Sequence, residues 1–251
     1  SNVDVVFVDP ARRDPNAARR IDGTTQRIFN PSLWSPSWEF INQLSLSVPV
    51  VAKVAPGIDE QLIADWDAMW ISHDGDIVEA MLTKPISGNR PSRKAVLLSS
   101  QSSTQMVFEG ESSPPIFDSG DFLVCPDGAI TRAGALDVLA KSVHGGLVNE
   151  HIGWITTSDR DAVQDLVTLK PSPASCFEII GQSKCDPKSL AMAIREVPAS
   201  AITIMTRGVN VDVDGLRRKI MPALDKAAPE LVLALYRDDG GNRALVTRRL
   251  Q

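Results

Sequence analysis

The chain has 251 residues, of which 43% are hydrophobic and 23% are charged, a balance that excludes a disordered protein and suits one large or two smaller globular domains. A formal net charge of -5 gives no reason to expect a general coat for nucleic acid. The charge is uneven, however: residues 165–251 carry thirteen Lys and Arg against ten Asp and Glu, a net +3, which leaves a net -8 for the rest. The C-terminal third is therefore the better candidate for contact with a polyanion.

The cysteines, the histidines and the apolar runs indicate the cellular compartment of the protein and whether it binds a metal. Cys125, Cys176 and Cys185 are odd in number, which argues against a disulfide framework, and neither they nor the three histidines have metal-ligand spacing. No apolar run approaches the roughly 20 residues needed to cross a bilayer, and no signal peptide precedes the first expected strand. We expect a cytoplasmic protein without a metal site or a membrane span.

The first part of the chain alternates between strands and helices. Residues 5–8 are apolar without interruption, which is typical of a strand buried on both faces in a parallel sheet. A long polar stretch, 11–36, separates this strand from a helix that Ser37 caps. A second buried strand at 48–54 and a helix at 58–64 follow, and this alternation predicts a parallel α/β sheet.

The next segments change character and then give way to a linker. Short strands are expected at 69–72, 78–82, 95–99 and 105–108, joined by polar turns. They predict an antiparallel meander on the sheet edge. Residues 112–120 contain two prolines and several small polar residues, which is typical of a linker.

The remainder predicts a connecting segment and a small α+β domain. One helix is expected over 129–143, ending at Gly145-Gly146, and prolines at 171 and 173 mark a second break. The elements expected beyond it are strands at 176–180, 201–205, 231–236 and 244–247, and helices at 187–195 and 213–220. We therefore expect three parts, at 1–111, 112–165 and 166–251.

Asp9-Pro10 directly follows the first expected strand. In open α/β sheets, ligands bind outside the carboxyl ends of the strands, where an acidic side chain can hold an amine and a proline fixes the turn. The alternative is that Asp9 caps a turn and that Arg12 and Arg13 are solvated surface charges. From these residues alone both interpretations stay open.

The longer motifs resemble a known family. "VFVDPARR", "VVAKVAPGID" and "GDIVEAMLT" resemble the second half of the catalytic domain in class I S-adenosylmethionine-dependent methyltransferases that carry a THUMP-like C-terminal domain. "FLVCPDGAITRAGALDVLA" and "IGWITTSD" look like the connecting segment of that family, and "CFEII" with "AITIMTRGVNVDVDGLRRKI" is similar to its C-terminal domain. The resemblance implies the C-terminal half of a Rossmann-like class I methyltransferase sheet, plus a small α+β THUMP-like domain.

The resemblance also implies roles for the first motif. Asp9 and Pro10 would stand where related amino-methylating enzymes carry Asp/Asn-Pro-Pro-aromatic after the fourth strand, a motif that orients the target amino group. Ala11 replaces the second proline, and Arg12 replaces the aromatic residue that stacks on a base. A guanidinium also stacks on a base or binds phosphate, so we assign Asp9 and Pro10 to catalysis and Arg12 and Arg13 to substrate binding.

Four further residues are candidates for substrate binding. Lys53 ends the second expected strand, and Glu79 matches an acidic position in the edge hairpin of the family. Arg207 and Arg218 belong to the densest basic cluster of the chain, together with Arg217 and Lys219. Solvated helix charges are the alternative explanation of this cluster, and contact with RNA phosphates is the functional one.

The cofactor implied by the resemblance is S-adenosyl-L-methionine. Enzymes of this class bind it with a Gly-rich loop after the first strand, and neither Gly145-Gly146 nor Gly240-Gly241 has that context. We therefore interpret the chain as a piece that starts at the fourth strand, with Ser1-Asn2 as a cloning remnant, and we expect an incomplete cofactor site and no activity from the piece alone.

Two functions follow from these residues and motifs. The first is an S-adenosylmethionine-dependent methyltransferase that acts on RNA when full length. The second is a non-catalytic RNA-binding or scaffold protein with a degenerate methyltransferase fold. The methyl acceptor, the modified atom and the oligomeric state are left open by the sequence.

Overall fold

The computed structural model describes residues 3–13, 28–84, 90–110, 113–117, 119–195, 197–220 and 225–250, so Ser1 and Asn2 lie outside the described residues. The chain divides into two compact units. The first consists of Ser1–Gly110 with Gly128–Ala133, and the second of Glu111–Asp127 with Gly134–Gln251. Each unit is built on its own sheet.

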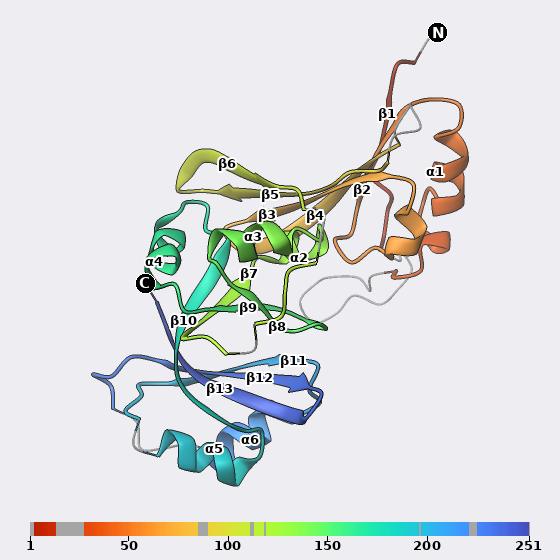
Figure 1. Cartoon of the computed structure of the whole chain (residues 1–251). Helices are drawn as coiled ribbons and strands as arrows, with labels where there is room; N and C mark the ends of the chain where they lie inside the picture. The colour runs from red at the N-terminus through yellow and green to blue at the C-terminus, as the bar shows by residue number, and fades with distance from the viewer. Residues whose placement is uncertain are drawn as a thin grey trace. The chain divides into compact units, whose positions relative to one another are not determined.

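The sheet of the first unit contains six strands within the described residues (Figure 1). They are β1 (Val6–Val8), β2 (Val50–Val54), β3 (Asp67–His73), β4 (Asp76–Thr83), β5 (Arg93–Ser99) and β6 (Ser102–Phe108). Their order is β1-β2-β4-β3-β5-β6. Four further elements belong to this unit: the 3-10 helices η1 (Pro31–Leu33) and η2 (Glu60–Ile63), and the helices α1 (Trp38–Leu44) and α2 (Gly128–Arg132).

The parallel pair expected at the start of the chain is confirmed. β1 and β2 run parallel, with Val8 opposite Ala52, so both strands end at the same edge of the sheet. The Ser37 hydroxyl accepts a hydrogen bond from the Phe40 N–H at 3.3 Å and caps α1, as the sequence predicts. The segment after β2 forms only the short 3-10 helix η2 where a longer helix was expected.

The antiparallel meander predicted after β2 is wrong. β4 is antiparallel to both β2 and β3 and lies between them, while β3 and β5 pair in parallel. The reversal takes place at Asp74-Gly75, where both residues have positive φ values of 51° and 88°. A tight turn there folds β4 back along β3, and its free edge then pairs with β2.

One face of this sheet holds the core of the unit. Trp70, Leu82 and Ala52 alternate inward and are at most 1% exposed. Ile41 of α1 and Ile130 of α2 are both fully buried; α1 contacts β2, and α2 contacts β3, β4 and β5. The alternate positions along β2 and β4, among them Lys53 and Glu79, are only half-buried, so polar side chains are tolerated on that second face.

The second unit is built on a seven-stranded sheet within the described residues. Its strands are β7 (Phe122–Pro126), β8 (Gly146–Asn149), β9 (Ile152–Thr157), β10 (Ala174–Lys184), β11 (Ile202–Arg207), β12 (Leu231–Asp238) and β13 (Gly241–Arg249). The order is β11-β12-β13-β10-β7-β9-β8. Its helices are α3 (Leu136–Ser142), α4 (Arg160–Thr168), α5 (Pro187–Ile194) and α6 (Val213–Ile220).

The single helix expected over 129–143 is two short helices, α2 and α3. The break falls at Gly134, which has a positive φ of 69°, a conformation that glycine adopts without steric cost. The chain also passes from the first unit back to the second at this glycine. Apolar spacing at helical period continues across the break, which is why the sequence did not reveal it.

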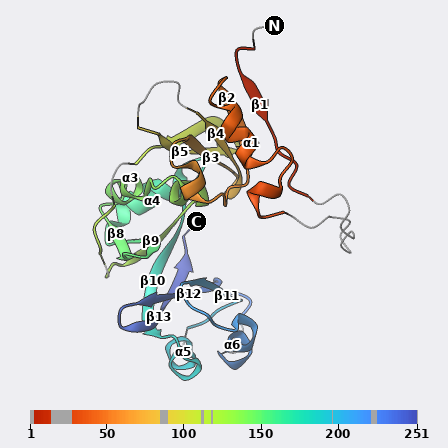
Figure 2. The ribbon, with the colours of Figure 1, turned by 90° about the vertical axis from the view of Figure 1, so that its right-hand side faces the viewer.

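The C-terminal elements follow the expected order, and α6 has the bounds that the sequence predicts. Helices α5 and α6 pack on one face of β11, β12 and β13 (Figure 2), where Leu190, Leu216 and Leu233 share a core. The opposite face carries a second core that contains Trp154 and Tyr236, whose ring centroids lie 6.4 Å apart. Because β9 and β12 are not neighbours in the sheet, this contact indicates that the sheet is strongly curved.

Candidate active site

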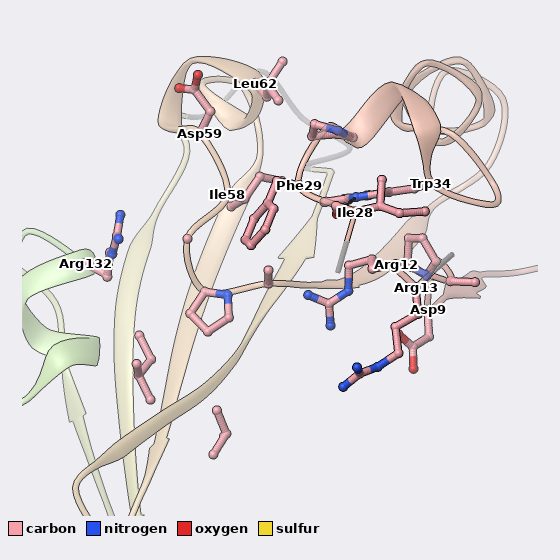
Figure 3. A pocket seen from close by; sticks show the side chains of 18 of the residues that line it. Asp9, Arg12, Arg13, Ile28, Phe29, Trp34, Ile58, Asp59, Leu62 and Arg132 are labelled. Carbon is pink, nitrogen blue, oxygen red and sulfur yellow. Dashed lines mark hydrogen bonds between the residues drawn. The ribbon is translucent and has the colours of Figure 1, made fainter. Parts of the chain in front are cut away.

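A cavity of about 890 Å³ opens at the carboxyl ends of β1 and β2 (Figure 3). All the residues that line it belong to the first unit. They are Asp9, Pro10, Ala11, Arg12, Arg13, Ile28, Phe29, Pro31, Trp34, Ala55, Pro56, Gly57, Ile58, Asp59, Leu62, Ile77, Val78, Gly128 and Arg132. A cavity of this size at the ends of parallel strands is the usual position of a ligand site in an open α/β sheet.

The segment after β1 is held in place by backbone pairing. Ala11 exchanges two hydrogen bonds with Ser35, at 2.8 and 3.2 Å, and the Ile28 N–H donates to the Arg12 carbonyl at 2.8 Å. The indole N–H of Trp34 donates to the Ile28 carbonyl at 3.0 Å. The turn that carries Asp9 and Pro10 is therefore tied to the segment before α1.

The segment after β2 forms the facing wall of the cavity. The indole N–H of Trp70 donates to the Pro56 carbonyl at 3.0 Å, and the Asp59 side chain accepts from the Gln61 N–H at 2.9 Å and caps η2. A Cβ atom added at Gly57 would lie 3.9 Å from a guanidinium nitrogen of Arg132, so the end of α2 brings a cation to this wall.

Three of the residues predicted for the site lie together. The Lys53 ammonium is 3.2 Å from the Glu79 carboxylate and 3.7 Å from the Asp9 carboxylate. The hydrogen bond to Glu79 is the main cause that raises the pKa of Lys53 above its usual value, and the charges of Glu79 and Asp9 add to it. Lys53 and Glu79 are not among the residues that line the cavity, and Lys53 adjoins it through its ion pair with Asp9.

Several residues of the cavity were not predicted from the sequence. Three of them carry an aromatic ring or a charge: Phe29, Asp59 and Arg132. The Phe29 ring is 84% exposed and projects into the cavity (Figure 3). It adds an aromatic surface to the wall of the cavity that includes Arg12. Among the described residues that line the cavity, Arg12, Arg13 and Arg132 outnumber the carboxylates Asp9 and Asp59.

The two basic candidates of the second unit do not form one surface. The Arg207 guanidinium lies 5.7 Å from the ring centroid of Trp154, which belongs to the core on one face of the sheet. Arg218 is an exposed residue of α6, whose Leu216 and Ile220 pack into the core on the other face. The two arginines therefore belong to opposite faces of the sheet.

The glycine pairs of the second unit have structural reasons for being glycine. A Cβ atom at Gly145 would lie 2.4 Å from the Thr156 carbonyl oxygen, and one at Gly146 would lie 2.4 Å from that of Pro115. Gly240-Gly241 forms the turn between β12 and β13. Gly145-Gly146 therefore leaves no space beside its backbone for a cofactor, whereas Gly241 is explained by its positive φ of 121°.

Two of the three thiols of the second unit have strongly raised pKa values. Burial raises the pKa of Cys125 to about 12 and that of Cys176 to about 11, so both stay protonated at neutral pH. In the described part of the chain, no group of three or more His, Cys, Asp or Glu side chains is placed to hold a metal ion. The described helices include none that is long and apolar enough to cross a membrane.

Comparison with known proteins gives a family match in the C-terminal part of the chain. Residues 174–249 match the family described as THUMP domain-like. Two proteins of Mycobacterium tuberculosis strains, both named "uncharacterized S-adenosylmethionine-dependent methyltransferase", are 28% identical to the chain over 223 residues, which is 86% of this chain and 56% of each relative. The chain thus spans little more than half the length of these relatives.

A solved structure extends the similarity to the fold. The crystal structure of a "putative methyltransferase" from Porphyromonas gingivalis matches 99% of this chain and 60% of its own, with a TM-score of 0.67 and 19% sequence identity. At this identity the match concerns the fold alone. The chain is thus similar in fold to this structure over nearly its whole length, and its residues 174–249 match the THUMP domain-like family.

Proposed function

We propose that the chain is the acceptor-binding part of an S-adenosylmethionine-dependent methyltransferase, in which Asp9 and Pro10 hold the atom that receives the methyl group. The observation that carries the proposal is the cavity at the carboxyl ends of β1 and β2, with Asp9-Pro10 on one wall and Pro56-Gly57 on the other. The names of the mycobacterial relatives support the reaction class and the cofactor.

Positioning is the main task of these residues. S-adenosylmethionine supplies, when bound, a methyl group on a positively charged sulfur. Displacement at that carbon needs an acceptor lone pair in line, which makes orientation the largest contribution. The Asp9 carboxylate can only accept hydrogen bonds and so orients an acceptor N–H, while Pro10 fixes the backbone of the turn.

Lys53 and Glu79 restrict the position of the Asp9 carboxylate. Lys53 is shared between the two carboxylates at 3.7 and 3.2 Å, and it therefore limits the rotamers that Asp9 adopts. We assign Lys53 and Glu79 to positioning, because neither lines the cavity. Arg12 and Arg13 line the cavity and contribute positive charge for an anionic substrate.

We further infer that the acceptor is part of an RNA. The match of residues 174–249 to THUMP domain-like proteins supports this substrate class, and so does the net +3 charge of residues 165–251 against a net -8 elsewhere. Arg207 and Arg218 are the candidates for phosphate contact. They belong to opposite faces of the sheet, so we expect one of the two to make the contact.

The test uses the longest natural protein that contains this chain, with tritium transfer from S-adenosylmethionine to total RNA as the readout. Asp9→Ala is expected to lower the transfer rate at least a hundredfold while changing cofactor affinity little, because Asp9 contacts the acceptor. Asp4→Ala, an exposed acid just before β1, is the matched control and is expected to retain activity.

Two outcomes contradict the proposal. Equal loss of transfer and cofactor affinity in Asp9→Ala would make Asp9 a structural or cofactor-binding residue. RNA binding without any transfer by the wild-type protein would favour a non-catalytic RNA-binding protein.

A further inference from the structure

The cavity contains an apolar ring that no other part of the described chain covers. Phe29 is 84% exposed, more than any other large hydrophobic residue of the described chain, although it lines the cavity. An apolar ring left in water forfeits the favourable free energy of burial. A large exposed aromatic side chain inside a cavity is therefore a candidate for contact with a ligand.

The backbone beside Phe29 is well held. Ile28 donates its N–H to the Arg12 carbonyl at 2.8 Å, and its own carbonyl accepts from the Trp34 indole at 3.0 Å. On the other side, the Asn30 side chain accepts from the Ser32 N–H at 3.1 Å and caps η1. The backbone that carries the ring is thus fixed relative to the Asp9-Pro10 turn, which lowers the entropic cost of binding.

The groups around Phe29 define the chemistry of a fitting ligand. Ile58 and Leu62 extend the apolar wall, and Arg12 and Arg132 bring guanidinium groups to the same cavity (Figure 3). An apolar face suits a flat ring, a guanidinium suits a phosphate, and the Asp9 carboxylate suits an N–H donor. A nucleotide with an amino group on its base combines these three features.

We propose that Phe29 is the stacking platform for the base of a nucleotide acceptor, whose phosphate binds at Arg132 and whose amino group faces Asp9. The inference rests on the proposed function for the assignment of this ligand as the methyl acceptor. Binding itself requires no methyl transfer, so it is measured separately. Stacking on an aromatic side chain does not depend on the identity of the base, and the amino group supplies the selectivity.

The test is a titration of the 251-residue chain with adenosine 5′-monophosphate, followed by the NMR shifts of residues 28–34. Phe29→Ala is expected to weaken binding by about fivefold to a hundredfold, the range found for loss of one base–aromatic stack. Phe29→Trp is expected to bind at least as tightly as the wild type. Phe40→Ala removes an exposed phenyl ring of α1 that does not line the cavity, and it is expected to bind as the wild type does.

Two further titrations distinguish the contribution of the base to binding from that of the phosphate. Ribose 5-phosphate, which has no base, is expected to bind the wild type and Phe29→Ala equally weakly. Arg132→Ser is expected to weaken adenosine 5′-monophosphate several-fold and to leave adenosine unchanged.

The proposal is overturned if Phe29→Ala binds adenosine 5′-monophosphate like the wild type, or if the wild type shows no shifts at millimolar nucleotide. If binding depends on Phe29 but the full protein transfers no methyl group, the stacking site stands and the proposed enzyme function fails. If the enzyme is active and Phe29→Ala leaves its KM for RNA unchanged, the function stands and this inference fails.

Discussion

At the scale of single residues, the site is built by strand pairing. Asp9 follows Val8, which lies opposite Ala52 in the parallel pair of β1 and β2, so Lys53 is its neighbour across the strands. Glu79 joins them because β4 pairs with β2. The sequence named all three residues from strand ends and family motifs, but the ion-pair chain depends on the position of β4.

Phe29 shows what sequence reasoning missed at this scale. It lies in a long polar stretch without apolar periodicity, so nothing local distinguishes it from a loop residue. Its role in the cavity depends on hydrogen bonds that join Ile28 to Arg12 and to Trp34. Arg132 was missed for a related reason, since the end of a helix far along the chain returns to the first unit.

The ion pair between Lys53 and Glu79 gives a prediction about pH. Because Glu79 is the main cause of the raised pKa of Lys53, Glu79→Gln should shift that pKa back toward its usual value. A cation with a raised pKa contributes to the stability of the fold at neutral pH, and this contribution is lost as the pH rises through the raised pKa. The lysine side-chain NMR signal, followed from pH 8 to 12, measures the shift.

A titration of Lys53 that is identical in Glu79→Gln and the wild type would show that the two groups do not interact in solution. Asp65→Asn, which removes the carboxylate paired with Lys84, is the control. It should leave the titration of Lys53 unchanged.

At the scale of elements, the sequence predicted most helices and strands and mispaired one group of strands. The alternation of apolar residues in β4 is the same whether the strand lies outside β3 or between β2 and β3, since both positions bury one face. Only long-range pairing decides between them. The helix break between α2 and α3 was missed because one glycine interrupts a pattern that otherwise keeps its period.

Gly134 gives a prediction at this scale. Gly134→Ala should lower the free energy of unfolding by about 1 kcal/mol, because a side chain at a φ of 69° is strained although no atom lies near the new Cβ. Gly134→Asn should lower the free energy of unfolding less than Gly134→Ala does, since Asn tolerates this conformation better. Urea denaturation measures both.

Gly181 in β10 is the matched control for this experiment. A Cβ atom there would make ordinary contacts, the nearest at 3.7 Å to Val246. Gly181→Ala should therefore change stability less than Gly134→Ala. A larger loss at Gly181 would mean that backbone strain is not the cause.

At the scale of the whole molecule, the sequence predicted the fold class and the presence of the C-terminal THUMP-like domain. It treated residues 112–165 as a connector, whereas β7, β8 and β9 of that segment are strands of the seven-stranded sheet. Their short apolar runs are bounded by glycines and polar turns. Nothing in these runs indicates that the sheet continues through β10, which lies further along the chain. The boundaries expected at 111 and 165 stay predictions.

The curved sheet gives a prediction about RNA binding. Because Arg207 and Arg218 belong to opposite faces, only one of the charge reversals Arg207→Glu and Arg218→Glu should weaken binding of a structured RNA by the whole chain. With two or three phosphate contacts, the log-log slope of affinity against salt should be roughly -2 for single strands. The charge reversal that weakens binding should also make this salt dependence shallower.

Filter binding at several salt concentrations measures both affinity and slope. Lys188→Glu, a charge reversal of the same kind on the exposed side of α5, controls for the general loss of positive charge. Equal losses from both arginine variants, beyond that of the control, would contradict the two-face arrangement.

The strand β10 pairs with β13 along most of its length and with β7 over Ala174–Glu178. Leu123 and Trp154, which precede the THUMP-like segment, share a core with Phe177 and Tyr236 inside it. A gene fragment cut to 174–249 would therefore leave one edge of β10 unpaired and open half of an apolar core to water. The segment that matches the family is shorter than the segment that shares its core, so we expect a transplantable version of this domain to begin before Phe122.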